Sequence, residues 1–203
     1  RVLLRPSSLT WWTTDVLAAH APKYFPVEEF AVITRGHGTG AEFAALAFDA
    51  LCFTGSPETG ASVAAAAARQ LVPVTLELGG KNPAIVDVDA DLSRSARRIA
   101  KARMTNGGQV CLCPDYVFVP ERSVDEFAHR VLATWRGMYP SIVDNPGYTS
   151  IVDESHYHRV LDLVTDATQS GAVARQVVPP GESLPDAGTR KIAPTLLTGV
   201  TAD

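Results

Sequence analysis

Residues 50–60 read Ala50-Leu51-Cys52-Phe53-Thr54-Gly55-Ser56-Pro57-Glu58-Thr59-Gly60, the pattern of a buried strand that turns into a helix. The apolar start predicts the strand, and the serine, proline and glutamate suit the cap, the first position and the first turn of a helix. The alanine-rich segment that follows predicts a helix to about Gln70, and residues 74–78 predict the next strand. This order predicts a βαβ unit and therefore an α/β fold.

The same alternation of apolar strands and helices extends through the chain on both sides of this unit. Before it we expect strands at residues 2–4 and 30–34 and helices at 15–20 and 40–47; after it, strands at 84–88, 116–119, 172–178 and 194–197 and helices at 91–104, 124–138 and 153–171. Gly79-Gly80 is a hinge between two sets of elements, so we place a domain boundary there. No internal repeat or low-complexity tract interrupts the pattern.

Composition excludes several classes of protein. The chain has 203 residues, 46% of them hydrophobic and 20% charged, which predicts a globular protein of one or two domains. A net charge of -4 predicts no nucleic-acid partner, and the longest apolar run, residues 61–68, is too short for a membrane span. Three cysteines form neither a disulfide framework nor a zinc site, so we expect no metal and a reducing cytoplasm.

Two motifs carry chemistry: Leu76-Glu77-Leu78-Gly79-Gly80-Lys81 and Asn106-Gly107-Gly108-Gln109-Val110-Cys111. A thiolate attacks a carbonyl carbon, and a carboxylate can activate the water that later hydrolyses the acyl-enzyme. The plainer alternative is that the glutamate is a solvated turn residue and the cysteine a small buried side chain, as we expect for Cys52 and Cys113. Cys111 differs because glycines precede it and a strand follows it, which places it on a tight loop.

The start of the helix after Gly55 is a candidate anion site. A helix N-terminus offers unpaired N–H groups and the positive end of a dipole, which suit a pyrophosphate. The alternative is an ordinary helix capped by Ser56. The glycine-rich stretch 36–40 is a weaker candidate, because it lacks the G-x-G-x-x-G spacing and is more typical of a turn.

Both motifs and their spacing resemble those of the aldehyde dehydrogenase superfamily. The resemblance runs from the Arg5-Pro6-Ser7 turn to the strand at residues 194–196. Residues 111–116 and 145–151 make the chain most similar to the coniferyl-aldehyde type. The resemblance implies that residues 1–78 are the C-terminal part of a Rossmann-like NAD(P)-binding domain and that residues 79–203 are most of an α/β catalytic domain. The chain starts at Arg1 and stops within a strand-like segment, so we expect a fragment of a longer, homo-oligomeric parent.

The resemblance also assigns roles to single residues. It implies that Cys111 is the nucleophile, that Glu77 is the general base for deacylation, and that Asn106 supports the thiol loop. The residues that the resemblance implies for binding NAD or NADP are Arg5, Ser8, Gly55, Ser56 and Leu78. Where the family typically has lysine and glutamate, this chain has Arg5 and Ser8, which leaves the choice between NAD and NADP open.

Three function classes remain open at this stage. The first is NAD(P)-dependent oxidation of a small-molecule aldehyde to a carboxylic acid. The second is a truncated, inactive protein that binds cofactor or a partner, and the third is an unrelated thiol acyltransferase. The identity of the aldehyde cannot be read from the sequence.

Overall fold

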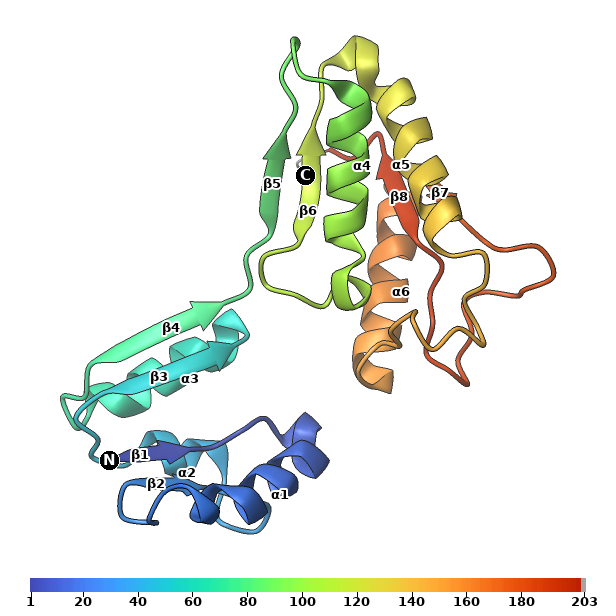
Figure 1. The fold of residues 1–203 in the computed structure, drawn as a ribbon. Helices are drawn as coiled ribbons and strands as arrows, with labels where there is room; N and C mark the ends of the chain where they lie inside the picture. Colours follow the sequence, from blue (N-terminus) through green and yellow to red (C-terminus); the bar gives the residue numbers. More distant parts are fainter. Residues whose placement is uncertain (202–203) are drawn as a thin grey trace. The chain divides into compact units, whose positions relative to one another are not determined.

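The computed structural model describes residues 1–201, which form two compact units, residues 1–79 and the residues from Gly80 onward (Figure 1). Helices and strands alternate along the chain, so the predicted α/β class is confirmed. No helix among the described residues has the length and apolar character needed to cross a bilayer.

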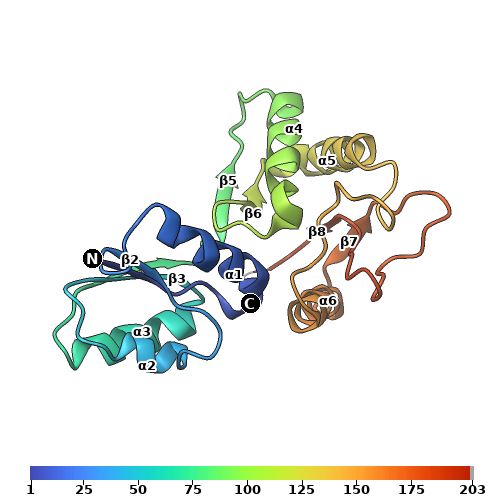
Figure 2. The same ribbon diagram turned by 60° about the horizontal axis from the view of Figure 1, so that its bottom comes forward.

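The first unit contains two pairs of parallel strands, each pair joined through helical segments. One pair is β1 (Val2–Leu4) and β2 (Phe30–Val32), with α1 (Trp11–His20) between them in sequence. The other is β3 (Leu51–Gly55) and β4 (Val74–Leu78), connected by α3 (Pro57–Ala68) and preceded by the short α2 (Gly40–Ala44). Figure 2 shows α2 and α3 together on one side of β3.

The βαβ unit forms where the sequence predicts it. The Ser56 hydroxyl caps α3 by accepting a hydrogen bond from the Thr59 N–H at 3.2 Å, and Pro57 occupies the first turn. The alanine-rich helix packs on the strands through a small core of Ala44, Leu51, Ala67 and Val72. Cys52, which we expected to be buried, is exposed, because it points away from the face of β3 that Leu51 buries.

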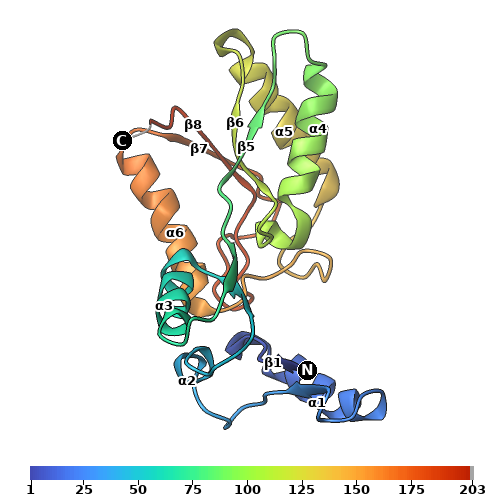
Figure 3. The same cartoon turned by 90° about the vertical axis from the view of Figure 1, so that its left-hand side faces the viewer.

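The second unit begins with a parallel pair of strands, β5 (Asn82–Ile85) and β6 (Pro114–Phe118). Two helices that run in the same direction, α4 (Leu92–Arg103) and α5 (Val124–Met138), pack against one face of this pair, and α6 (Glu154–Gln169) is on the other side in Figure 3. The predicted apolar stripe of α5 is its buried face, with Phe127, Val131, Leu132 and Trp135 in the core. The Trp135 indole donates to the carbonyl of Ala100 at 3.0 Å.

The rest of the second unit is α6 and an antiparallel pair, β7 (Val173–Gln176) and β8 (Thr195–Thr198). Asp153 caps α6 through the His156 N–H at 2.8 Å, and Gly171, with a φ of +100°, follows its end. Helix and strand ends differ from the predictions by a few residues, because end residues fray and pair according to tertiary contacts.

Candidate active site

Cys111 lies on the loop that returns the chain from the end of α4 to the start of β6. A short helical turn, residues 105–108, precedes it, in which Asn106, Gly107 and Gly108 have φ values of +52°, +64° and +81°. Three successive residues in the left-handed region reverse the chain within a few positions, and two of them are glycines, for which that region carries no steric cost. The glycines in the motif therefore shape the loop that presents the cysteine.

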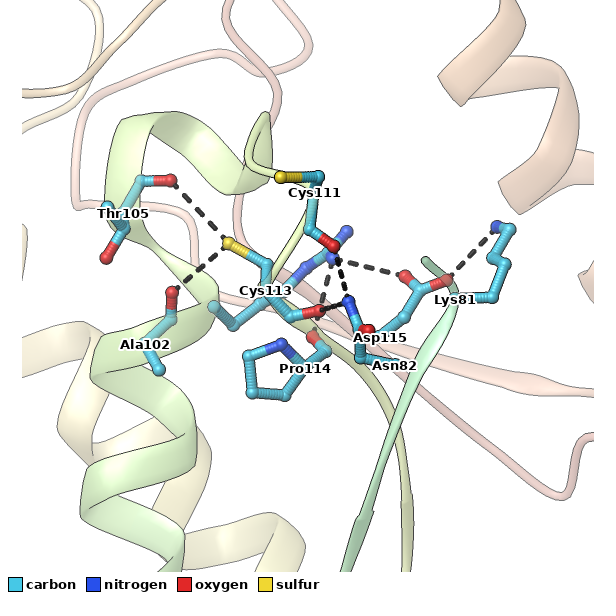
Figure 4. A network of polar contacts seen from close by, with 9 residues as sticks. Lys81, Asn82, Ala102, Thr105, Cys111, Cys113, Pro114 and Asp115 are labelled. Atoms are coloured by element: carbon cyan, nitrogen blue, oxygen red, sulfur yellow. Dashed lines mark hydrogen bonds and ion pairs between the residues drawn. The ribbon is translucent and has the colours of Figure 1, made fainter. Parts of the chain in front are cut away.

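The two cysteines of this loop have opposite environments. The Cys111 side chain is exposed, whereas Cys113 is buried and its thiol donates to the carbonyl of Ala102 at 3.4 Å and is 3.9 Å from that of Thr105. In Figure 4 the Cys113 sulfur points toward the carbonyls of Ala102 and Thr105, whereas no drawn contact reaches the Cys111 sulfur. The prediction of a buried Cys113 is confirmed, and of these two thiols only that of Cys111 is open to a reagent or substrate.

A side-chain amide from β5 holds the backbone of both cysteines. Asn82 Nδ2 donates to the carbonyl oxygen of Cys111 at 2.6 Å and to that of Cys113 at 3.1 Å (Figure 4). A Cβ atom on Gly80 would lie 2.5 Å from Asn82 Oδ1 and 2.7 Å from the Cys111 carbonyl oxygen. Glycine is therefore required at position 80 for this close approach.

A second amide fixes the other side of the loop. Gln109 Nε2 donates to the carbonyls of Asn106 at 3.1 Å and Ser150 at 3.0 Å, and Gln109 Oε1 accepts from the Val152 N–H at 3.0 Å. Asn106 Nδ2 in turn donates to the Gln109 carbonyl at 3.3 Å. Gln109 thus ties the cysteine loop to the chain before α6, and Asn106 shapes the loop internally.

An ion-pair cluster lies beside the loop at the start of β6. The Asp115 carboxylate is 3.1 Å from both the Lys81 ammonium and the Arg103 guanidinium, and Arg103 also donates to the Pro114 carbonyl at 3.4 Å (Figure 4). Lys81 is largely exposed, so its bond to Asp115 is screened by water and contributes little to stability. The cluster links the start of β5, the end of α4 and the start of β6.

The carboxylate and three of the candidate cofactor residues, Gly55, Ser56 and Leu78, lie at or just beyond the carboxyl ends of β3 and β4. Parallel register places Thr54 beside Glu77 and Gly55 beside Leu78, so the carboxyl ends of both strands are adjacent. Glu77 is exposed, and Ser56 follows directly as the cap of α3. In open parallel sheets, ligands bind just outside the carboxyl ends of the strands.

Arg5 and Ser8 lie elsewhere in the first unit, after β1. The Arg5 guanidinium donates to the Gly38 carbonyl at 3.0 Å, while its buried Nε has no hydrogen-bond partner among the described residues. Ser8 is exposed in a short 3₁₀ turn, Ser8–Thr10. Arg5 therefore contacts the glycine-rich turn at residues 36–40.

Two supporting residues escaped the sequence prediction. Gln109 stands inside the quoted cysteine motif and Asn82 directly follows the glutamate motif, so their positions were a usable signal. Apart from the Asn106 carbonyl, their partners lie 29 to 43 residues away and could not be inferred from spacing. Glu77 belongs to the first unit, and Cys111 and its supports belong to the second.

Comparison with known proteins places this geometry in a family. The family model described as the aldehyde dehydrogenase family matches residues 1–203. Two similar proteins are a probable coniferyl aldehyde dehydrogenase of Caulobacter vibrioides, 43% identical over 203 residues, and a coniferyl aldehyde dehydrogenase of a Pseudomonas species, 43% identical over 200 residues. The matches cover 100% and 98% of this chain but 42% of each relative.

A solved structure gives the same result for the fold. Aldehyde dehydrogenase C of Pseudomonas syringae, a mutant solved with NAD+ and octanal, is similar with a TM-score of 0.85 and 28% identity. The match covers 98% of this chain and 42% of that one. The chain thus spans less than half the length of the relatives that it resembles.

Proposed function

Because the chain belongs to the aldehyde dehydrogenase family, we propose that its protein oxidises an aldehyde to a carboxylic acid with NAD or NADP, through a thioester on Cys111. The observation that carries this proposal is the Cys111 thiol, exposed on a loop whose backbone is held by the amides of Asn82 and Gln109. A fixed nucleophile with free access is what covalent catalysis on a carbonyl requires.

An aromatic aldehyde of the coniferyl type is the proposed substrate class. The support is the 43% identity to two proteins described as coniferyl or probable coniferyl aldehyde dehydrogenases. We further propose that the intact protein is a cytoplasmic homo-oligomer, as the family resemblance implies.

The residues at the edge of β3 and β4 fit a dinucleotide. The N-terminus of α3 suits an anionic diphosphate, and Gly55 and Leu78 flank it on the two adjacent strands. The buried Nε of Arg5, which has no partner among the described residues, supports its role toward the adenosine ribose, since a buried N–H is ordinarily paired. We assign Ser8 to the same region of the cofactor.

The proposed reaction starts when the Cys111 thiolate forms a bond to the aldehyde carbon. The oxyanion that results accepts hydrogen bonds from N–H donors, one of them the Cys111 backbone amide. When bound, the cofactor supplies a hydride acceptor, so the carbon is oxidised to a thioester on Cys111. Glu77 then takes a proton from water, the resulting hydroxide attacks the thioester, and the carboxylic acid and the thiolate are released.

The thiol assignment is tested with two alanine variants. Purified protein is assayed for reduction of NAD+ and NADP+ with an aromatic and an aliphatic aldehyde. Cys111→Ala should abolish turnover, because the nucleophile is lost, whereas Cys113→Ala should retain most of it. Alkylation with iodoacetamide and peptide mapping should label Cys111 ahead of Cys113. Loss of activity on preferential labelling of Cys113 would contradict the assignment.

The carboxylate is tested by time-resolved kinetics. Glu77→Gln should slow steady-state turnover yet allow a first burst of reduced cofactor, because acylation and hydride transfer come before its role. Steady-state turnover at the wild-type rate would show that another group activates the water.

A further inference from the structure

We propose that Asn82 is a positioning residue for Cys111, whose amide sets the direction in which the nucleophilic thiol faces; this rests on the proposed function. The Asn82 Nδ2 atom reaches the carbonyls on both sides of Leu112, at 2.6 Å for Cys111 and 3.1 Å for Cys113. One amide group therefore fixes two carbonyls of the segment that carries the thiol.

These two contacts determine the orientation of the backbone at Cys111. The Cys111 carbonyl belongs to the planar peptide unit that joins Cys111 to Leu112. Once this carbonyl is held toward β5, the orientation of that whole peptide unit is fixed. In Figure 4 the Cys111 sulfur lies on the far side of its backbone from the Asn82 amide. Holding the carbonyl inward thus directs the side chain outward, where it is exposed.

Asn82 is itself held in place by its neighbours. Lys81, directly before Asn82, has a φ of +48°, so a residue in the left-handed region sets the turn that enters β5. A Cβ on Gly80 would lie within 2.7 Å of the Asn82 amide atoms and of the Cys111 carbonyl, so the segment and the loop are in direct contact. The amide has little freedom to donate elsewhere.

Because the hydrogen bond from Asn82 to the Cys111 carbonyl is exposed, we expect it to matter more for the orientation of the loop than for the stability of the fold. The shorter hydrogen bond, to the Cys111 carbonyl, is solvent-exposed, so water can replace the donor when Asn82 is lost. The fold then loses little, but the loop loses the contact that sets its direction. We therefore expect substitution of Asn82 to affect catalysis far more than melting temperature.

Kinetics on the full protein test this expectation. Asn82→Ala should lower kcat by about tenfold or more, as expected when a nucleophile is misplaced, while KM for the cofactor and the melting temperature stay near wild type. Asn82→Ser, which keeps one donor, should give an intermediate kcat. Gly80→Ala should resemble Asn82→Ala, because its methyl group displaces the amide.

A matched control is available on β7. Gln176 also has an exposed side-chain amide, which donates to Thr195 Oγ1 at 3.2 Å, so Gln176→Ala should leave kcat unchanged. Wild-type kcat in Asn82→Ala would overturn the proposal. A fall in its melting temperature of about 5 °C or more would overturn it too, because the bond would then be needed for folding.

Hydrogen exchange separates this proposal from the proposed function. In Asn82→Ala the amides of residues 110–113 should exchange several-fold faster, with α5 unchanged. If wild-type protein reduces no cofactor with any aldehyde, the proposed function fails, while faster exchange of the loop still supports the positioning role of Asn82. Unchanged exchange in the loop would overturn that role.

Discussion

Replacing the buried Lys191 with methionine is expected to destabilise the second unit. Lys191 is 6% exposed, and its ammonium donates to the carbonyls of Ile142, Val143 and Asn145 at 2.9, 3.0 and 2.8 Å. The Glu182 carboxylate accepts from the N–H groups of Ile142 and Val143 on the same segment. A cation on the carbonyls and an anion on the amides hold residues 142–145 together.

The size of the effect follows from how many acceptors lose their donor. A hydrogen bond to a charged group contributes about 1.5–3 kcal/mol, and a buried acceptor left unpaired costs about 1–3 kcal/mol. Only the bond to Ile142 is fully buried, so water can replace the donor at the other two carbonyls. Methionine also avoids the cost of burying a charge. We expect a net loss of about 2–3 kcal/mol.

Urea unfolding followed by tryptophan fluorescence measures this loss. Trp11 and Trp12 are changed to phenylalanine, so that Trp135 alone reports on the second unit. With a slope of about 2 kcal/mol per M, Lys191→Met should lower the midpoint by about 1 M or slightly more. Lys101→Met, at an exposed lysine of α4, is the control and should change it little. Equal midpoints in the two variants would show that desolvation of the ammonium cancels its three hydrogen bonds.

Three further substitutions or conditions give separate tests. Gln109→Ala should lower kcat by about tenfold or more with little change in cofactor KM, because the cysteine loop loses its tie to the chain before α6; a wild-type kcat would contradict this role. Burial raises the pKa of Tyr148, whose hydroxyl donates to the Ile192 carbonyl. The neutral Tyr148 hydroxyl therefore contributes its full stabilisation below the unfolded pKa of about 10, and this contribution declines as the pH rises above that value. Urea midpoints of the wild type and of Tyr148→Phe, measured across that pH range, report the decline. The same dependence on pH in both proteins would refute the prediction. Trp135→Phe should cost about 2–4 kcal/mol in a urea titration followed by circular dichroism, since the Ala100 carbonyl loses its donor and the core loses volume; a loss below about 1 kcal/mol would mean that water reaches that carbonyl.

The sequence by itself determined the elements and singled out the thiol. Helix caps such as Ser56, Asp91 and Asp153 act within three residues of themselves, and the apolar stripe of α5 repeats along one helix. These signals are local, so they can be read without knowledge of the fold. The glycines before Cys111 likewise indicated a tight turn, which the left-handed residues of the loop confirm.

Only the tertiary structure decided what surrounds these elements. The bonds from Asn82 to the Cys111 loop join residues 29 and 31 positions apart, and those from Lys191 to residues 142–145 join residues 46 to 49 positions apart. The exposure of Cys52 depends in the same way on which face of β3 is covered. Such contacts arise when distant segments pack together, and hydrophobic spacing along the chain carries no record of which donor will meet which carbonyl.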